Sequence, residues 1–412
     1  MAGIYIHIPF CKQACHYCNF HFSTSLRYKN EFVAALLKEI ELFTVGSRQS
    51  AVGSHQSAVG SHQSADGKIE TIYFGGGTPS LCTKNELTAI IEKLRSSFIV
   101  STDAEITLEA NPDDITYESL QDWKAVGINR LSIGVQSFFP EDLEWMNRAH
   151  TVQQAVSSLQ LAVREFSNIT IDLIYGTPQL TNEKWKQNVE TAISLGVPHL
   201  SCYALTVEPK TPLDKMIRQH ESPDVDPGKQ SEQFLLLMKW AEEAGYEHYE
   251  ISNFAKPGWR SRHNSSYWRG IPYYGFGPSS HSFDGNSRWW NVANNNKYIE
   301  SINKNIIPLE KEVLTPVQKI NEYIMTSLRT VEGISLQLAV SSWQSSVGSR
   351  QSVDPAVLKP AEGENSQLIV EQLLEKSKKY VDEGLIVIEN DFIRLTKEGK
   401  LLADGIAADL FF

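Results

Sequence analysis

The sequence predicts an α/β protein: a partial (β/α)6 barrel followed by a smaller, helical and winged-helix-like accessory domain at the C-terminus. Six short apolar runs alternate with helix-periodic stretches between Ile4 and about Pro209, the pattern of parallel strands joined by helical crossovers. Glycine-rich and polar motifs follow these runs, where ligands collect in such folds. From about Leu314 helical patterns return and end in two short strands.

The predicted strands are apolar runs rich in Ile, Leu, Val and Phe, which favour extended structure. They span residues 4–8, 69–74, 105–108, 130–135, 169–174 and 199–205. Helical spacing of apolar residues predicts helices between them over residues 30–43, 84–98, 116–126, 140–147, 151–165 and 182–195. Later helices are predicted at 231–244, 316–329 and 366–383, followed by two strands around Asn390-Asp391.

Changes of composition divide the chain into three regions. Residues 1–230 are expected to form the core barrel, 231–313 to complete it, and 314–412 to form the accessory domain. A seven-residue repeat (VGSRQSA, VGSHQSA, VGSHQSA) interrupts the first region at 45–66, and a similar unit (VGSRQSV) lies in a second insertion at 341–353. Gly and Ser in every unit exclude a coiled-coil seam and a preformed metal site at His55 and His62, so both insertions are predicted to be disordered.

Composition narrows the range of functions. The formal net charge of −11 disfavours a nucleic-acid partner, which requires a basic face. No apolar run approaches the roughly 20 residues of a membrane-spanning helix, and the N-terminus lacks the basic region of a signal peptide. Reduced cysteines require a reducing compartment, so we expect a cytoplasmic protein.

Three cysteines, Cys11, Cys15 and Cys18, follow the first strand with the spacing C-x3-C-x2-C. Three thiolates can bind three irons of a [4Fe–4S] cluster and leave the fourth iron open to a small molecule, whereas an electron carrier normally uses four cysteines. Zinc remains an alternative because His7, His16 and His21 lie nearby. The spacing resembles that of the radical S-adenosylmethionine (SAM) superfamily. Cys82 and Cys202 are isolated and are interpreted as structural.

Other predicted strands also end in residues suited to ligand binding. The second strand runs into Gly75-Gly-Gly-Thr-Pro79, where glycine allows close backbone approach to a ligand. Glu109, Gln136 and Arg148 follow later strands, and Asp172 lies inside an apolar strand, where an unpaired charge is costly. Asp172 is therefore half of an internal ion pair or a ligand contact. An acid can bind ribose hydroxyls and an arginine can bind a carboxylate, and SAM offers both groups.

Five motifs extend the resemblance to a family. YIHIPFCKQACHYC, the glycine motif of residues 73–81, LEANPDD, RLSIGVQSF and IDLIYGTP are similar to the oxygen-independent coproporphyrinogen III oxidase family over nearly the whole chain apart from the repeats. The resemblance implies a radical SAM partial barrel with a C-terminal accessory domain, containing a [4Fe–4S] cluster and SAM. It implies SAM contacts at Tyr5, Tyr17, Gly76, Gly77, Thr78, Glu109, Gln136, Arg148 and Asp172.

The family has two branches, and the sequence resembles the heme-chaperone branch. The oxidative decarboxylases carry a further cysteine where this chain has Phe20, and an N-terminal extension that we do not expect here. The chaperones carry H-N-x-x-Y-W, present as residues 263–268, which implies that His263 is an axial ligand of heme iron. The isolated motif would more often be a structural turn. The following Gly275-Phe-Gly-Pro-Ser-Ser-His-Ser282 is interpreted as a tight turn beside the SAM pocket.

The resemblance therefore implies a protein that binds heme and delivers it to hemoproteins at the membrane, with weak or absent net radical chemistry. The alternative is an oxygen-independent coproporphyrinogen III dehydrogenase that decarboxylates its substrate by a radical route. A radical SAM enzyme acting on another substrate is a third reading. The sequence leaves open whether SAM is cleaved, which hemoprotein receives the heme, and whether the chain forms a homodimer.

Overall fold

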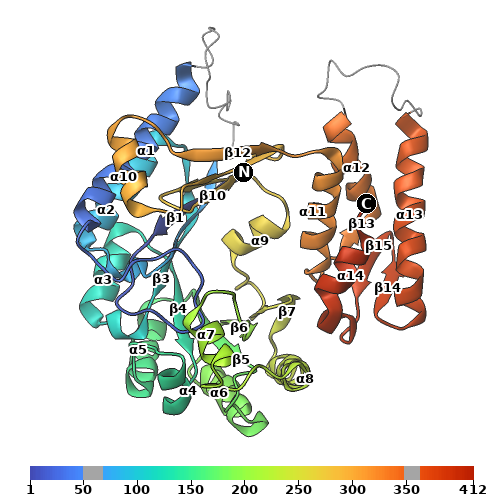
Figure 1. The fold of residues 1–412 in the computed structure, drawn as a ribbon, viewed down its shortest axis with the longest axis horizontal. Helices are drawn as coiled ribbons and strands as arrows, with labels where there is room; N and C mark the ends of the chain where they lie inside the picture. Colours follow the sequence, from blue (N-terminus) through green and yellow to red (C-terminus); the bar gives the residue numbers. More distant parts are fainter. Residues whose placement is uncertain (50–67, 348–361) are drawn as a thin grey trace.

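A twelve-stranded mixed sheet dominates the computed structural model, which describes residues 1–49, 68–347 and 362–412 (Figure 1). The strand order is β12-β11-β10-β9-β1-β2-β3-β4-β5-β6-β8-β7. Strands β9 and β1 to β6 run parallel to one another, while the strands at both flanks are antiparallel. The predicted α/β architecture is confirmed, with a curved, open sheet in place of a closed barrel among the described residues.

Six strand–helix units build the parallel part of this sheet, in agreement with the sequence pattern. The strands are β1 (Ala2–Ile8), β2 (Ile69–Gly76), β3 (Val100–Ala110), β4 (Arg130–Gln136), β5 (Ile169–Tyr175) and β6 (His199–Ala204). The helices between and after them are α1 (Lys29–Gln49), α2 (Lys84–Ser97), α3 (Tyr117–Val126), α4 (Pro140–Trp145), α5 (Val152–Glu165), α6 (Asn182–Ser194), α7 (Pro212–Arg218) and α8 (Pro227–Glu243). Capping boxes that begin at Thr83, Thr116 and Thr151 fix the starts of three helices.

Side chains of the parallel strands alternate between two environments. One face carries apolar residues such as Ile4, Ile6 and Ile8, which are fully buried in the main hydrophobic core together with apolar residues of the surrounding helices. Because registered neighbours in a parallel sheet share a face, the other face collects the polar residues. These are Thr71, Tyr73, Glu105, Thr107, Glu109, Arg130, Ser132, Thr170, Asp172, His199 and Ser201. The inner face of the partial barrel is therefore polar.

The region after α8 extends the sheet at both flanks. Strands β7 (Glu247–Glu250) and β8 (Asn253–Ala255) add to β6, and β9 (Tyr273–Phe276), β10 (His281–Phe283), β11 (Ser287–Asn291) and β12 (Leu309–Val313) add to β1. Helix α10 (Asn295–Asn303) packs on α1. The short helix α9 (Arg262–Trp268) lies between the sheet and the C-terminal helices (Figure 1).

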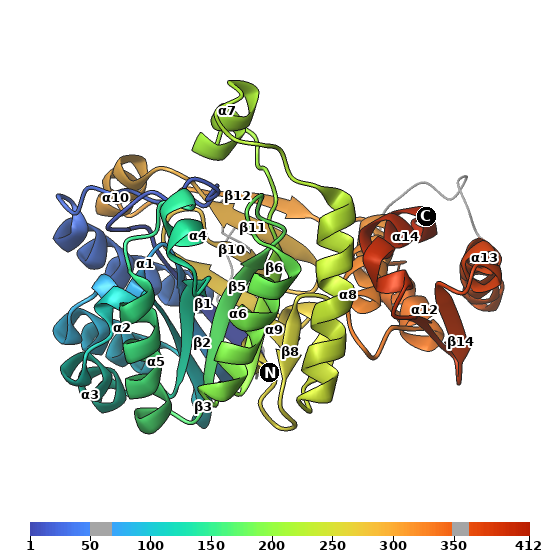
Figure 2. The same ribbon diagram turned by 90° about the horizontal axis from the view of Figure 1, so that it is seen from below.

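The C-terminal residues form a second core with its own small sheet (Figure 2). Its helices are α11 (Pro316–Leu328), α12 (Leu336–Val347), α13 (Glu362–Asp382) and α14 (Ala403–Leu410). Strands β13 (Ile334–Ser335), β15 (Phe392–Leu395) and β14 (Ile386–Glu389) pair in that order, all antiparallel. Three 3-10 turns, η1 (Pro79–Leu81), η2 (Pro112–Asp114) and η3 (Gly399–Leu402), complete the described elements. Helices combined with a β14–β15 hairpin give the winged-helix-like arrangement expected from the sequence.

The expected insertions need correction at their borders. Helix α1 runs through Gln49 and so includes residues 45–49, and α12 includes residues 341–347. Residues 50–66 and 348–353, which hold the rest of the repeats with His55 and His62, lie outside the described residues. None of the helices in the described part of the chain is long and apolar enough to cross a membrane.

Candidate functional site

A cavity of about 480 Å³ lies at the carboxyl ends of the parallel strands and gathers most of the predicted site residues. Its lining comes from the loop after β1 and from the ends of β2 to β6. Eleven predicted residues line it: Cys11, Cys15, Cys18, Tyr17, Gly76, Gly77, Thr78, Glu109, Gln136, Arg148 and Asp172. Positions separated by more than 150 residues in the sequence thus share one site, because parallel strands place all their carboxyl ends at one edge.

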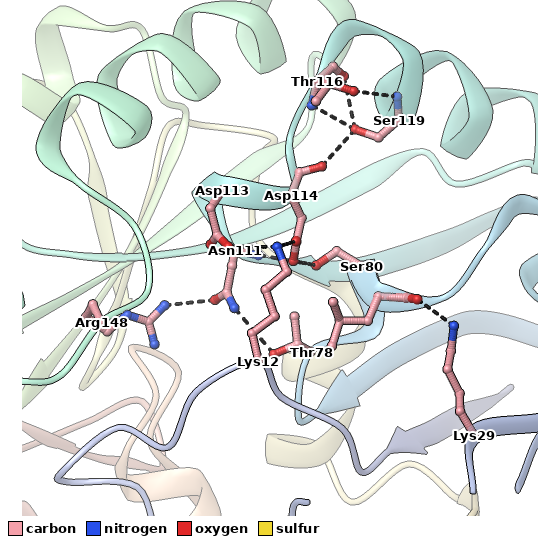
Figure 3. A network of polar contacts seen from close by, with 11 residues as sticks. Lys12, Lys29, Thr78, Ser80, Asn111, Asp113, Asp114, Thr116, Ser119 and Arg148 are labelled. Carbon is pink, nitrogen blue, oxygen red and sulfur yellow. Dashed lines mark hydrogen bonds and ion pairs between the residues drawn. The ribbon is translucent and has the colours of Figure 1, made fainter. Parts of the chain in front are cut away.

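Contacts with two neighbouring segments hold the cysteine loop over the cavity. The backbone of His16 donates to the Met146 carbonyl, and Asn147 donates from Nδ2 to the Ala14 carbonyl at 2.7 Å. On the other side, Lys12 forms ion pairs with Asp113 and Asp114 in the turn that follows β3 (Figure 3). Asp114 also accepts from Ser80 at 2.7 Å, which connects this turn to the glycine motif. The three free thiols, all half-buried, are therefore presented on an anchored loop.

Arg148 donates hydrogen bonds to four residues in the cavity wall beside the cysteines. Its Nη1 donates to Cys15 Sγ at 3.1 Å and to the Tyr17 hydroxyl at 3.4 Å. Its Nη2 donates to Asn111 Oδ1 and to the Gly134 carbonyl, each at 2.8 Å. Burial opposes the charge, but the Tyr17 and Cys15 groups raise the pKa of Arg148 above its ordinary value. A permanent positive charge thus faces the cysteine loop.

The glycine motif lies close to the cysteine loop. Gly76 has a φ of +99°, and its N–H donates to Glu109 Oε2 at 3.0 Å. A Cβ at Gly77 would lie 2.6 Å from the Ile8 carbonyl and 2.7 Å from the Phe10 carbonyl. These glycines are therefore required for close packing of β2 against the cysteine loop, and that packing places the Thr78 side chain in the cavity wall.

Two carboxylates in the cavity have strongly shifted pKa values. Burial raises the pKa of Glu109 to about 7, with nearby Asp172 adding to the rise. Burial also raises the pKa of Asp172 to about 7, although Arg148 opposes this shift. Tyr73 donates to Glu109 Oε1 at 2.8 Å. A carboxyl group with a pKa near 7 can accept a hydrogen bond from a cationic or hydroxyl-bearing ligand at little cost, because such a ligand stabilises the ionised form of the carboxyl group.

Strained backbone also occurs in the cavity wall. Gln136, the last residue of β4, has a φ of +70°. A non-glycine residue in the left-handed region costs free energy and is typical of ligand-binding positions. Its side chain lines the cavity beside Gly134, where any Cβ would lie 3.1 Å from both the Gln136 amide nitrogen and an Arg148 nitrogen.

The donor set fits the cofactors that the sequence predicts. Three cysteines without disulfide partners lie on one loop, and Nε of the buried Arg148 has no hydrogen-bond partner among the described residues. The guanidinium places a buried positive charge in the cavity wall, which suits the carboxylate of SAM. No described group of three or more His, Cys, Asp or Glu residues is arranged to hold a single metal ion, so the zinc alternative gains no support. A cubane cluster needs no such group because each thiolate binds a different iron.

Tyr5 and the GFGPSSHS segment do not line the cavity. Tyr5 lies on the neighbouring strand, stacks on Tyr73 with a centroid distance of 6.2 Å and donates to His7 Nδ1 at 3.1 Å. The GFGPSSHS segment is a tight turn as expected, but it packs behind β1, where a Gly277 Cβ would lie 2.5 Å from the His7 carbonyl. It does not line the cavity.

His263, the predicted heme ligand, is placed differently from the expectation. Its side chain is 2% exposed, and both ring nitrogens have partners: Nδ1 lies 2.8 Å from Thr71 Oγ1 and Nε2 lies 2.8 Å from the Tyr267 hydroxyl. Burial lowers its pKa to about 3. Axial ligation of heme iron would require breaking one of these bonds and opening the barrel interior. In this structure His263 is therefore enclosed, and its assignment as a heme ligand stays a prediction.

Several residues that line the cavity were not predicted from the sequence. Asn111 joins Arg148 to Thr78, donating to Thr78 Oγ1 at 3.3 Å, and Tyr73 orients Glu109. Ser132, Ser201 and Asn264 also line the cavity. The signal for Asn111 was present, since it follows β3 directly in LEANPDD. Asn264 carried no such signal, because α9 reaches the cavity only through tertiary packing.

Comparisons with known proteins show the family and the fold of the chain. The model of the radical SAM superfamily matches residues 5–217. The chain is similar to proteins named heme chaperone HemW: 31% identical over 99% of this chain and 94% of the Mycobacterium tuberculosis protein, and 32% identical over 98% of each chain for Bacillus subtilis. Among solved structures it is similar in fold to the radical SAM coproporphyrinogen III oxidase HemN from Escherichia coli, with a TM-score of 0.79 and 22% identity, covering 100% of this chain and 90% of that one.

Proposed function

The chain belongs to the radical SAM superfamily and, within it, to the family of the HemW proteins, and on this basis we propose that it is a heme chaperone. It binds heme and delivers it to hemoproteins at the membrane, acting from the cytoplasm. The observation that carries the proposal is similarity over nearly the full length to relatives named heme chaperones. Phe20, which is 67% exposed at the cavity, supports it by standing where the decarboxylase motif has a cysteine.

The proposal includes a [4Fe–4S] cluster held by Cys11, Cys15 and Cys18, and SAM held by the remaining cavity residues. When bound, such a cluster supplies single electrons to SAM. The chain's own residues bind and orient the ligand. Arg148 places a fixed positive charge in the cavity wall that suits a carboxylate, and Glu109 and Asp172 accept from ammonium or hydroxyl groups.

A heme titration tests the proposal. Full-length protein with reconstituted cluster is titrated with hemin, and the Soret band is followed at fixed protein concentration. We expect saturable binding, followed by transfer to an added apo-hemoprotein. A protein in which Cys11, Cys15 and Cys18 are replaced by alanine serves as the cluster-free control.

Two results would overturn the proposal. One is an absence of saturable heme binding in protein whose visible spectrum shows an assembled cluster. The other is robust anaerobic conversion of coproporphyrinogen III to protoporphyrinogen IX, which would establish the decarboxylase instead.

A further inference from the structure

The C-terminal accessory domain has a free sheet edge beside an exposed helix face. In its small sheet β14 is the outer strand: β15 pairs with it on one side, and among the described residues no strand pairs with it on the other. Both views place β14 and α13 at the end of the molecule that is remote from the large sheet (Figure 1 and Figure 2). Neither element lines the cavity at the carboxyl ends of the parallel strands.

The pairing of β14 with β15 determines which backbone groups of β14 point outward. Antiparallel ladders alternate between hydrogen-bonded and non-hydrogen-bonded pairs. The Thr396 N–H donates to the Leu385 carbonyl at 3.0 Å, so the odd-numbered positions of β14 bond to β15. The N–H and C=O groups of Ile386 and Ile388 therefore point to the free edge, where no group in the described part of the chain pairs with them. Such an edge is a template for a further strand.

A groove lies beside these backbone groups. It is an open cavity of about 440 Å³ between β14 and α13. Leu374 and Val381, two turns apart on one face of α13, form its apolar floor together with Ile388 of β14. Val381 and Ile388 are 39% and 37% exposed, so this floor is open to solvent. A strand added to β14 would place alternate side chains over it.

The helical wall of the groove is mainly acidic. Glu371 and Glu375 line it with a single base, Lys378. Across the described residues the carboxylate of Glu375 has no ion-pair or hydrogen-bond partner. Glu389, exposed at the end of β14, adds a further negative charge. The groove therefore suits a segment that carries positive charge.

This charge also argues against DNA as the occupant. In helix-turn-helix domains the second helix of the pair enters the major groove, and α13 holds that place after α12. Phosphates would be repelled by Glu371 and Glu375 on the exposed side of this helix. The free strand edge favours a polypeptide, because its directional N–H and C=O groups match another extended backbone.

We propose that the edge of β14 and the facing side of α13 form a docking site for an extended segment of a partner protein. The segment adds a fourth strand to the small sheet and bonds to the backbone of Ile386 and Ile388. It carries an apolar side chain that covers the groove floor and, two positions away on the same face, a lysine or arginine that meets Glu371 and Glu375. This surface is separate from the cavity, so the inference does not depend on heme or SAM.

Peptide binding to the full-length, cluster-reconstituted protein tests the site. The probe is a fluorescently labelled peptide in which lysine, isoleucine and lysine occupy alternate positions with threonine between them, followed by fluorescence anisotropy. We expect saturable binding to the wild-type protein, and weaker binding when glutamate replaces both lysines. Glu375→Lys and Ile388→Ala should each weaken binding by about three- to tenfold, through charge reversal and through loss of apolar contact respectively.

Two variants serve as matched controls. Val387→Ala changes the neighbouring residue of β14, which is 38% exposed but lies on the opposite face of the strand. Glu118→Lys, on the exposed side of α3, changes the net charge as much as Glu375→Lys does. Both controls should bind the peptide as the wild-type protein does. All four replaced side chains are exposed, so the variants should fold, and thermal unfolding checks this.

Backbone methylation of the peptide tests strand addition separately from side-chain contact. N-methyl groups are placed either on the lysines and isoleucine or on the threonines. Because N–H groups alternate between the two edges of a strand, one of these sets faces β14 and the other faces solvent. We expect one methylated peptide to lose binding and the other to retain it.

Four results would overturn the inference. The first is an absence of saturable binding of the lysine–isoleucine peptide to folded protein. The second is equal binding by Glu375→Lys, Ile388→Ala and both controls, or by both methylated peptides. The third is self-association of the protein, measured by sedimentation, that Ile388→Ala abolishes, since a second copy would then occupy the edge. The fourth is binding of duplex DNA that Lys378→Glu abolishes.

Discussion

Arg148 donates a hydrogen bond from Nη1 to the sulfur of Cys15 across 3.1 Å, while its other terminal nitrogen is held by Asn111 and the Gly134 carbonyl. The guanidinium is therefore fixed from both sides and cannot turn away from the cysteine loop. A fixed positive charge beside a thiolate stabilises negative charge on that sulfur. This relationship connects the wall of the cavity to the electronic properties of any cluster that the loop holds.

Replacing Arg148 by lysine is expected to make the cluster harder to reduce. Lysine keeps the charge but cannot donate to Cys15, Asn111 and Gly134 in the same fixed geometry. A charge-assisted hydrogen bond contributes about 1.5–3 kcal/mol, and about 59 mV corresponds to 1.4 kcal/mol for one electron, so a reduction potential lower by tens of millivolts is expected. A redox titration followed by electron paramagnetic resonance measures it. Arg164→Lys, on an exposed turn of α5, is the control, and equal potentials in both variants would contradict the prediction.

Replacing Lys12 by alanine is expected to release the cysteine loop from the turn after β3. Lys12 is 39% exposed, so its pairs with Asp113 and Asp114 should contribute at most about 1 kcal/mol to global stability. Anchoring of the cysteine loop is a separate property from global stability. Without this anchor, the visible absorption of the cluster should decay faster in air. The decay of visible absorption checks this, with Lys84→Ala as a surface-pair control remote from the cysteine loop. Identical decay rates would show that the ion pairs do not anchor the loop.

The two cavity carboxyls predict a pH dependence of stability in the cofactor-free protein. The pKa values of Glu109 and Asp172 are raised to about 7 in the folded state, so folding favours their protonated forms. That contribution is fully present below about pH 4 and is lost as the pH rises through about 7.

The variant Glu109→Gln, whose side chain at this position cannot ionise, should lack the part of this loss that Glu109 causes. Relative to it, the wild-type protein should lose up to about 3 kcal/mol between pH 4.5 and 8, since one pKa unit corresponds to about 1.4 kcal/mol. Urea unfolding at several pH values measures the difference. Parallel stability profiles for the two proteins would refute the assigned shift.

Replacing His263 by alanine is expected to destabilise the fold. The change leaves a cavity beneath Tyr73 and removes the partners of Thr71 and Tyr267, which together predict a loss of about 2–5 kcal/mol in the free energy of unfolding. Asn264→Ala, on the next position, should cost less than about 1 kcal/mol because its carboxamide has no described partner. Denaturant unfolding of both variants makes the comparison, and similar midpoints would argue against a stabilising role of the buried His263 side chain.

Local pattern was sufficient for most of the fold. Each of the strands β1 to β6 was expected from an apolar run, and each lies at the expected position, because alternation of Ile, Leu and Val with polar residues fixes both the strand and its two faces. The last two strands around Asn390-Asp391 were equally readable, since both turn residues adopt a positive φ that suits Asn and Asp. Strands β9 to β12 were not expected, because short runs such as His281–Phe283 acquire their structure from the neighbouring strands.

The sequence by itself determined the cysteine loop, the glycine motif and the polar strand ends, since a strand's carboxyl end is a local property and parallel pairing brings all such ends to one edge. Only the tertiary structure decided the surroundings of residues 263–268. The same six letters read as a heme motif or as a structural turn, and no spacing distinguishes an exposed imidazole from a buried one. Packing of α9 against Thr71, Glu105 and Tyr73 encloses His263 and brings Asn264 to the cavity.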